Sequence, residues 1–220
     1  MHTLCELVQT DILGFLAKNE ELLFNERDLQ MHLAIWLRAS KNAYDDVDLE
    51  YYVPLHELRG YVWKSEMRLD IVVKKNGEFL PVELKYKTKR LERSLPRFGE
   101  VLSSKIPVMK NQSAQNLGMY NYWKDVRRLE LVCQRFASVK NGLAVFVTND
   151  PLYTQKTRST STSYPFDMSE GVHSKVKHWG GAGSSCAKDY PDFEVEKDYA
   201  IHWNQKTIDG EPFYYSIILV

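Results

Sequence analysis

The sequence predicts an α/β fold with a mixed central sheet flanked by helices. Apolar residues recur at helical spacing in three stretches, and shorter apolar runs at strand spacing lie between and after them. The clearest two runs are joined by Asn76-Gly77, which supplies the positive φ angles of a tight hairpin. This order gives an αβββαβ core followed by a C-terminal β-hairpin, and it favours a single domain over residues 1–220.

The composition is that of an ordinary globular protein, with 44% hydrophobic and 26% charged residues. Lys+Arg and Asp+Glu both number 29, and this neutral balance counts mildly against a nucleic-acid partner unless a local basic stripe exists. Cys5, Cys133 and Cys186 form no CxxC pair, so we expect a reducing compartment without a disulfide framework or zinc site. With no signal-peptide pattern and no long apolar run, we expect a cytoplasmic protein without membrane contact.

Helical periodicity predicts three helices. The first spans Leu4 to Phe15. The second spans about 26–39 and begins after Asn25, which is a favoured N-cap residue. The third spans about 115–139 and ends before Asn141-Gly142, a typical stop signal.

The predicted strands are 49–55, 67–74, 79–86, 143–148, 199–208 and 213–220. Pro81 inside the third strand predicts a bulge or local loss of pairing, because proline has no N–H to donate. The core covers about 25–150 and the terminal hairpin about 199–220. Between core strands, residues 91–109 have no clear period and are expected to form a loop with a short helix. Residues 154–163 are low in hydrophobicity and 180–185 read GGAGSS, which together predict a partly mobile insertion over 154–192.

Asp70, Glu83 and Lys85 are the strongest candidates for a functional site. Glu83 and Lys85 point to one face of their strand because side chains alternate, and Asp70 lies mid-strand on the partner across the hairpin. A charge in such an apolar run is costly unless it is paired or bound to a metal. Two carboxylates can hold Mg²⁺ while water and phosphate complete its shell. The adjacent acids should keep Lys85 protonated, which favours a charged positioning group over a free base.

R-L-D-I-V-V at 68–73 followed by V-E-L-K at 82–85 resembles the motif of the PD-(D/E)xK nuclease superfamily. The resemblance covers about 25–150 and identifies no subgroup. It implies a restriction-endonuclease-like fold and Mg²⁺- or Mn²⁺-dependent hydrolysis of DNA, in defence or DNA repair. The implied catalytic residues are Asp70, Glu83 and Lys85. Many members carry an extra metal ligand on the first core helix, a position that Glu26 matches.

A basic run follows this site. Its members Lys87, Lys89 and Arg90 are expected to contact nucleic-acid phosphates, with a solvated strand end as the alternative. A homodimer is one expectation, because nucleases that cut both strands often pair. A partner subunit that supplies affinity for DNA is another.

Each candidate also has a structural alternative. The three central residues could form a solvated cross-strand ion network, and Glu26 could stabilise the helix dipole. Asp125 and Arg128, spaced i, i+3 on the third helix, are expected to pair structurally rather than contact substrate. The alternative function is a catalytically inactive nuclease-like module that binds nucleic acid or serves as an accessory subunit.

Overall fold

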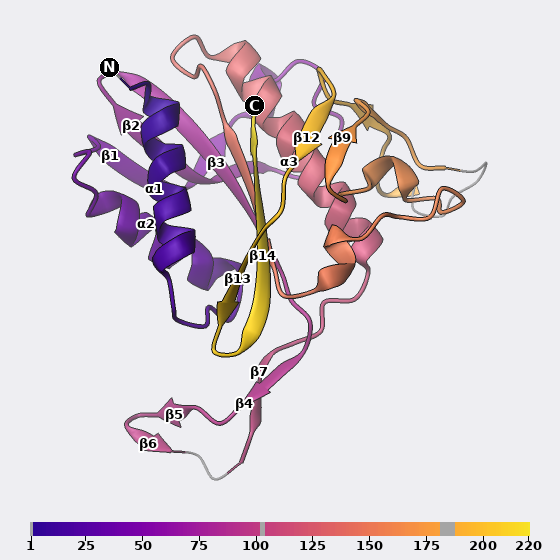
Figure 1. The fold of residues 1–220 in the computed structure, drawn as a ribbon. Coiled ribbons are helices and arrows are strands. Elements are labelled where there is room, and N and C mark those ends of the chain that lie inside the picture. Colours follow the sequence, from indigo (N-terminus) through magenta and orange to yellow (C-terminus); the bar gives the residue numbers. More distant parts are fainter. Residues whose placement is uncertain (1, 102–103, 181–187) are drawn as a thin grey trace.

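The computed structural model describes residues 2–101, 104–180 and 188–220, and it has the predicted α/β architecture. Within these residues, a six-stranded mixed sheet has the strand order β1-β2-β3-β8-β14-β13. Helices α1 and α2 lie on one side of the sheet and α3 on the other (Figure 1). A narrow β-ribbon projects away from this body and carries strands β4 to β7 (Figure 1).

The main sheet and its helices are built from long elements, and the rest of the chain forms short turns and strands. The helices are α1 Leu4–Lys18, α2 Glu26–Arg38 and α3 Gln115–Arg135, with short 3₁₀ turns at Leu55–Glu57, Pro151–Thr154 and Tyr164–Phe166. The strands of the main sheet are β1 Asp46–Val53, β2 Met67–Lys75, β3 Glu78–Lys87, β8 Leu143–Thr148, β13 Asn204–Ile208 and β14 Glu211–Leu219. The short strands are β4 Leu91–Arg93, β5 Pro96–Arg97, β6 Glu100–Val101, β7 Ile106–Met109, β9 Gly171–His173, β10 Val176–Lys177, β11 Phe193–Glu194 and β12 Tyr199–Ile201.

Turn chemistry sets the two hairpins of the main sheet. Asn76 and Gly77 have φ angles of 52° and 80°, and Asp209 and Gly210 have 49° and 77°. Two consecutive positive φ angles match the twist of antiparallel strands, and Asn, Asp and Gly tolerate them well. β2 therefore pairs antiparallel with β3, and β13 with β14. β3 pairs parallel with β8, which makes β3 the strand that connects the two halves of the sheet.

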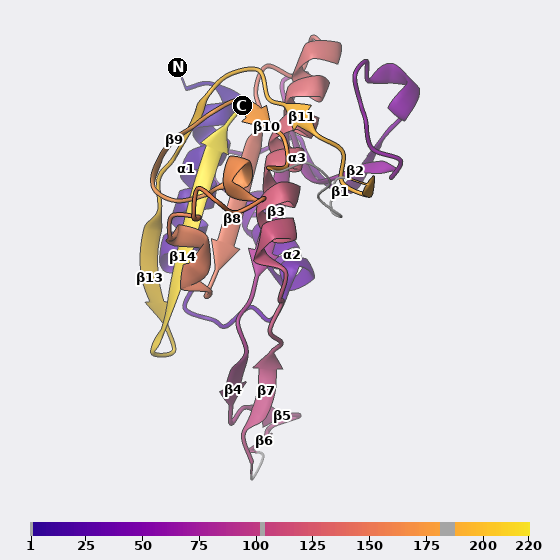
Figure 2. The ribbon, with the colours of Figure 1, turned by 90° about the vertical axis from the view of Figure 1, so that its right-hand side faces the viewer.

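Each face of the sheet has its own hydrophobic core. One core packs α1 and α2 against residues such as Val82, Leu84 and Val145. The other packs α3 against the opposite face together with Phe166 and Trp179 from the C-terminal third of the chain. Figure 2 shows α3 and the short strands β9 to β11 on this second face. Among the described residues, no helix is both long enough and apolar enough to cross a membrane.

Two local predictions are wrong. Residues 91–101 and 104–109 carry the strands of the β4–β7 ribbon instead of a loop with a short helix, because Leu91 and Met109 pair and are both buried at its base. Pro81 lies opposite Val72 in an unbroken register. β8 first pairs with β3 at Val82, so the missing N–H of Pro81 removes no bond on that side.

The described parts of the insertion at 154–192 pack against the second face of the sheet. Phe166 and Trp179 are buried, and their ring centroids lie 4.6 Å apart. Tyr120 of α3 stacks on Trp179 at 5.4 Å, which fixes the segment to the helix. Of the GGAGSS stretch, residues 181–185 lie outside the described residues.

Gly118 of α3 offers a test of this packing. A Cβ atom at this position would overlap the hydroxyl oxygen of Tyr153, which is buried without a hydrogen-bond partner among the described residues. We expect Gly118→Ala to lower the free energy of unfolding by about 1–3 kcal/mol through overpacking. Adding Tyr153→Phe should recover part of the loss, as measured by urea denaturation. Equal stability of wild type and Gly118→Ala would contradict the close approach of these elements.

Candidate functional site

The site forms where β2 and β3 diverge. Their ladder ends at the pair Ile71 and Val82, and the next two residues are Asp70 and Glu83. Beyond this point β3 keeps its parallel pairing with β8, but its N–H groups on the β2 side need other acceptors. Asp70 accepts a bond from the backbone N–H of Leu84 at 2.6 Å. Glu26 of α2 accepts a bond from the N–H of Tyr86 at 2.9 Å, so its side chain supplies the acceptor that β2 no longer provides.

Asp70 is a partly buried carboxylate that forms no ion pair with any other described residue. Burial raises its pKa to about 6, although Lys85 and the N–H of Leu84 favour the charged form. Asp125 and Glu26 act in the same direction as burial, because like charges disfavour ionisation. The surroundings of Asp70 therefore disfavour its ionised form.

Glu83 points toward α3 and is buried. Its Oε1 atom lies 3.1 Å from Nη1 of Arg128, yet it accepts no aligned hydrogen bond among the described residues. Burial raises the pKa of Glu83 well above its usual value, and the nearby Asp125 and Asp70 add to this effect against the opposing influence of Arg128. The second carboxylate is thus also desolvated and only partly compensated.

Lys85 is held in its charged form by the surrounding acids. Its Nζ atom lies 2.8 Å from Oδ2 of Asp125, with both side chains largely buried. Burial alone would lower the pKa of Lys85, but Asp125, Glu26 and the other acids outweigh it and raise the pKa above its usual value. The direction agrees with the expectation from sequence that Lys85 stays protonated.

Arg128 connects the helix to both strands. Its Nη1 atom lies 3.2 Å from Oδ1 of Asp125, which is the i, i+3 pair expected from the sequence. It also faces Glu83, and Nη2 donates to the backbone carbonyl of Arg68 on β2 at 2.7 Å. The pair is therefore part of the candidate site as well as of the helix.

Sequence reasoning missed two contributions. It kept Asp125 and Arg128 apart from the site, although charged residues on the apolar face of a helix predict a buried partner. It also missed Gln30 of α2, which donates from Nε2 to the carbonyl of Asp70 at 2.7 Å. Gln30 lies beside the buried Leu29 and Leu33, and a polar side chain on that face was the available signal.

The predicted nucleic-acid residues lie beside the site, where β3 leads into the projecting ribbon. Lys87 is half-buried, and burial lowers its pKa. Lys89 and Arg90 are exposed. The backbone of Lys89 is fixed by Asn149, whose side chain accepts from its N–H at 2.7 Å. Arg90 pairs with Glu92.

The carboxylates of this site supply oxygen ligands of the kind that Mg²⁺ prefers. Within the described ranges, no three His, Cys, Asp or Glu side chains are arranged to hold one metal. Glu26 remains a prediction as a third ligand. Mg²⁺ requires only one or two protein carboxylates, because water and phosphate oxygens complete its octahedron. Counting the described residues alone, Asp70 has no ion pair and Glu83 has a buried oxygen without a hydrogen-bond partner, so these two carboxylates fit that smaller set.

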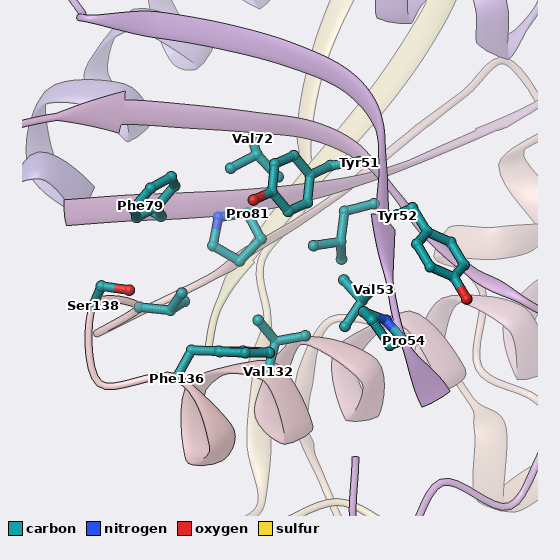
Figure 3. A pocket seen from close by; sticks show the side chains of 12 residues that line it. Tyr51, Tyr52, Val53, Pro54, Val72, Phe79, Pro81, Val132, Phe136 and Ser138 are labelled. Carbon is teal, nitrogen blue, oxygen red and sulfur yellow. The ribbon is translucent and has the colours of Figure 1, made fainter. Parts of the chain in front are cut away.

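An apolar cavity of about 340 Å³ lies elsewhere, between the outer strands of the sheet and the end of α3. Tyr51, Val72 and Phe136 are among the side chains that surround it (Figure 3). Neither Glu83 nor Lys85 lines it, so the cavity is separate from the candidate site.

The raised pKa of Asp70 predicts a pH-dependent stability difference in the absence of metal. Above pH 6 the ionised carboxylate destabilises the fold, whereas below the unfolded pKa of 3.8 the side chain is neutral in both states. We expect Asp70→Asn to be more stable than wild type at pH 8, and the difference to shrink as pH falls from about 6 to 4. Thermal unfolding of both proteins across this range, in EDTA, measures the effect. A wild type that is the more stable protein at pH 8 would contradict it.

No protein-family model matches the chain, and comparisons with curated proteins and with solved structures likewise gave no match. The resemblance to the nuclease superfamily stays a prediction from the motif at 68–85 and the order of the elements.

Proposed function

We propose that this protein is a metal-dependent nuclease that hydrolyses phosphodiester bonds in DNA. One observation carries the proposal: Asp70 is desolvated and forms no ion pair within the described part of the chain, and it lies beside the buried carboxylate Glu83. A buried charge without sufficient compensation is costly. A divalent cation would stabilise the ionised forms of both carboxylates at once. The PD-(D/E)xK-like spacing of Asp70, Glu83 and Lys85 supports this choice over a general cation site.

Each residue then has a definite role. Asp70 and Glu83 would hold Mg²⁺ or Mn²⁺, and the bound cation would supply positive charge to the phosphate and a more acidic water. Lys85, kept charged by Asp125, would face the negative charge that develops on the phosphate oxygens. Because its pKa is raised, Lys85 would orient the attacking water rather than remove its proton.

Two further side chains position this machinery. Glu26 fixes the end of β3 through Tyr86 and has a second carboxylate oxygen with which to approach the cation. When the cation binds, the Arg128 guanidinium would have to withdraw from Glu83. Its contacts with Asp125 and with the carbonyl of Arg68 would remain.

A second candidate function is a nuclease-like module without turnover. The pairs Lys85–Asp125 and Arg128–Glu83 favour it, since they partly neutralise the site from within the chain. The two functions differ in whether Asp70 and Glu83 acquire a cation, and cleavage assays separate them.

Cleavage of supercoiled plasmid and branched DNA with Mg²⁺ or Mn²⁺ tests the proposal. We expect Lys85→Ala and Asp70→Ala each to lower the cleavage rate by about a hundredfold or more, because each removes a group that acts on the transition state or its metal. Removing the metal with EDTA should abolish cleavage by the wild type.

Glu78→Gln is the matched control, since Glu78 is an exposed acid at the far end of the same strand. It should cleave like the wild type. Thermal unfolding of all variants verifies that they fold. Equal activity in wild type, Lys85→Ala and Asp70→Ala, or no activity in any of them, would refute the catalytic role.

A further inference from the structure

We infer that the projecting ribbon, formed by residues 89–101 and 104–110, enters a groove of duplex DNA and inserts Phe98 between base pairs. This ribbon is called the arm below. The inference rests on the proposed function for its choice of partner, and it adds how the DNA is held. It derives from the position of the arm, its charge and the conformation of its tip.

The arm leaves directly from the candidate site. It is inserted between β3, which carries Glu83 and Lys85, and α3, which carries Asp125 and Arg128 (Figure 1). Its base is fixed, because Thr88 donates from its hydroxyl to the carbonyl of Lys110 at 2.7 Å. The arm would therefore lie next to a phosphate bound at the site, with its base in a fixed position.

The charge of the arm differs from that of the whole chain. The segment 89–110 contains six basic and two acidic residues, for a net charge of +4, whereas the complete chain is neutral. Lys89, Arg90, Lys105 and Lys110 are exposed. Arg93 pairs with Asp209 and Glu211 of the β13–β14 hairpin. The other basic side chains form the local basic stripe that a nucleic-acid-binding protein of neutral net charge requires, because phosphate contacts are the dominant source of affinity.

Phe98 occupies the tip in an unusual conformation. Phe98 and Gly99 form a two-residue turn between β5 and β6, with φ angles of 53° and 84°. The equivalent turns of the main sheet have Asn76 and Asp209 at this position, which are residues that tolerate a positive φ. Phe98 instead places a fully exposed aromatic ring there. A bulky residue at a strained and solvated position favours a function for the ring, since it contributes nothing to the core.

The form of the arm suits a groove of duplex DNA, because two-stranded ribbons of DNA-binding proteins enter the major or the minor groove. An extended chain rises about 3.3 Å per residue, so the ten residues from Thr88 to Phe98 set an upper limit of about 33 Å on the distance from Thr88 to the tip. The β5–β6 hairpin at the tip turns aside from β4 and β7 (Figure 1). Proteins that enter the minor groove insert aromatic and apolar side chains between base steps, which unstacks the bases and bends the duplex, and Phe98 would act in this way. Arg97, whose guanidinium carbon lies 5.5 Å from the ring centroid of Phe24, links the tip to the body of the protein.

The decisive variant is Phe98→Asn. Asn favours the positive φ of this turn, so the variant keeps the arm while removing the ring.

In EDTA, which prevents cleavage, we expect Phe98→Asn to bind a short fluorescent duplex about tenfold more weakly than the wild type, because the stacking of the ring on a base is lost. The dependence of affinity on salt should stay the same, because no charge changes. Phe98→Trp should restore binding. Val172→Thr, at an exposed valine in β9 outside the arm, is the control and should bind like the wild type.

The outcomes separate this inference from the proposed function. Unchanged duplex affinity in Phe98→Asn, or no duplex binding by the wild type, overturns the inference whether or not the protein cleaves DNA. Weaker binding by Phe98→Asn together with rescue by Phe98→Trp supports it, even if no variant cleaves. Cleavage that depends on Lys85 but not on Phe98, with unchanged affinity, supports the nuclease and refutes the arm contact.

Discussion

The structure depends on the way in which buried carboxylates are compensated where β2 and β3 separate. If the ladder continued past Ile71 and Val82, the N–H groups of Leu84 and Tyr86 would bond to β2, and no acidic side chain would be needed there. The strands instead diverge, and the carboxylates of Asp70 and Glu26 replace the missing strand. Asp70 and Glu83 are desolvated at this point. Arg128 of α3 brings a cation to Glu83, because a buried charge without compensation is costly.

α3 provides that compensation incompletely. Arg128 pairs with Asp125 and faces Glu83, and Asp125 in turn holds Lys85, so two cations are shared among several acids. Asp70 and Glu83 retain raised pKa values because this sharing leaves them short of positive charge. A stable protein without a ligand would gain from neutralising them. Their persistence is typical of a functional site, where stability is lower so that a ligand can bind.

The sequence predicted the elements whose signals are local. Asn76-Gly77 located the hairpin, strand alternation placed Glu83 and Lys85 on one face, and apolar spacing located the helices.

Prediction from the sequence failed where tertiary contacts decide the outcome. The stretch 91–109 has no clear period, and its described residues, 91–101 and 104–109, form a ribbon whose base is the buried pair of Leu91 and Met109. The composition of the insertion did not indicate the aromatic contacts that pack its described parts against α3. The roles of Gln30, Asp125 and Arg128 depend on contacts between elements far apart in the sequence, which periodicity does not describe.

The most direct measurement is a crystal structure of the protein soaked in Mn²⁺, with the metal located by its anomalous scattering. We expect Mn²⁺ between the carboxylates of Asp70 and Glu83, with Arg128 withdrawn from Glu83 and Lys85 still paired with Asp125. The same soak of Asp70→Asn should show a weak peak or none. A wild-type crystal without metal at this position, in which Arg128 still faces Glu83 under saturating Mn²⁺, would contradict the metal site and favour the module without turnover.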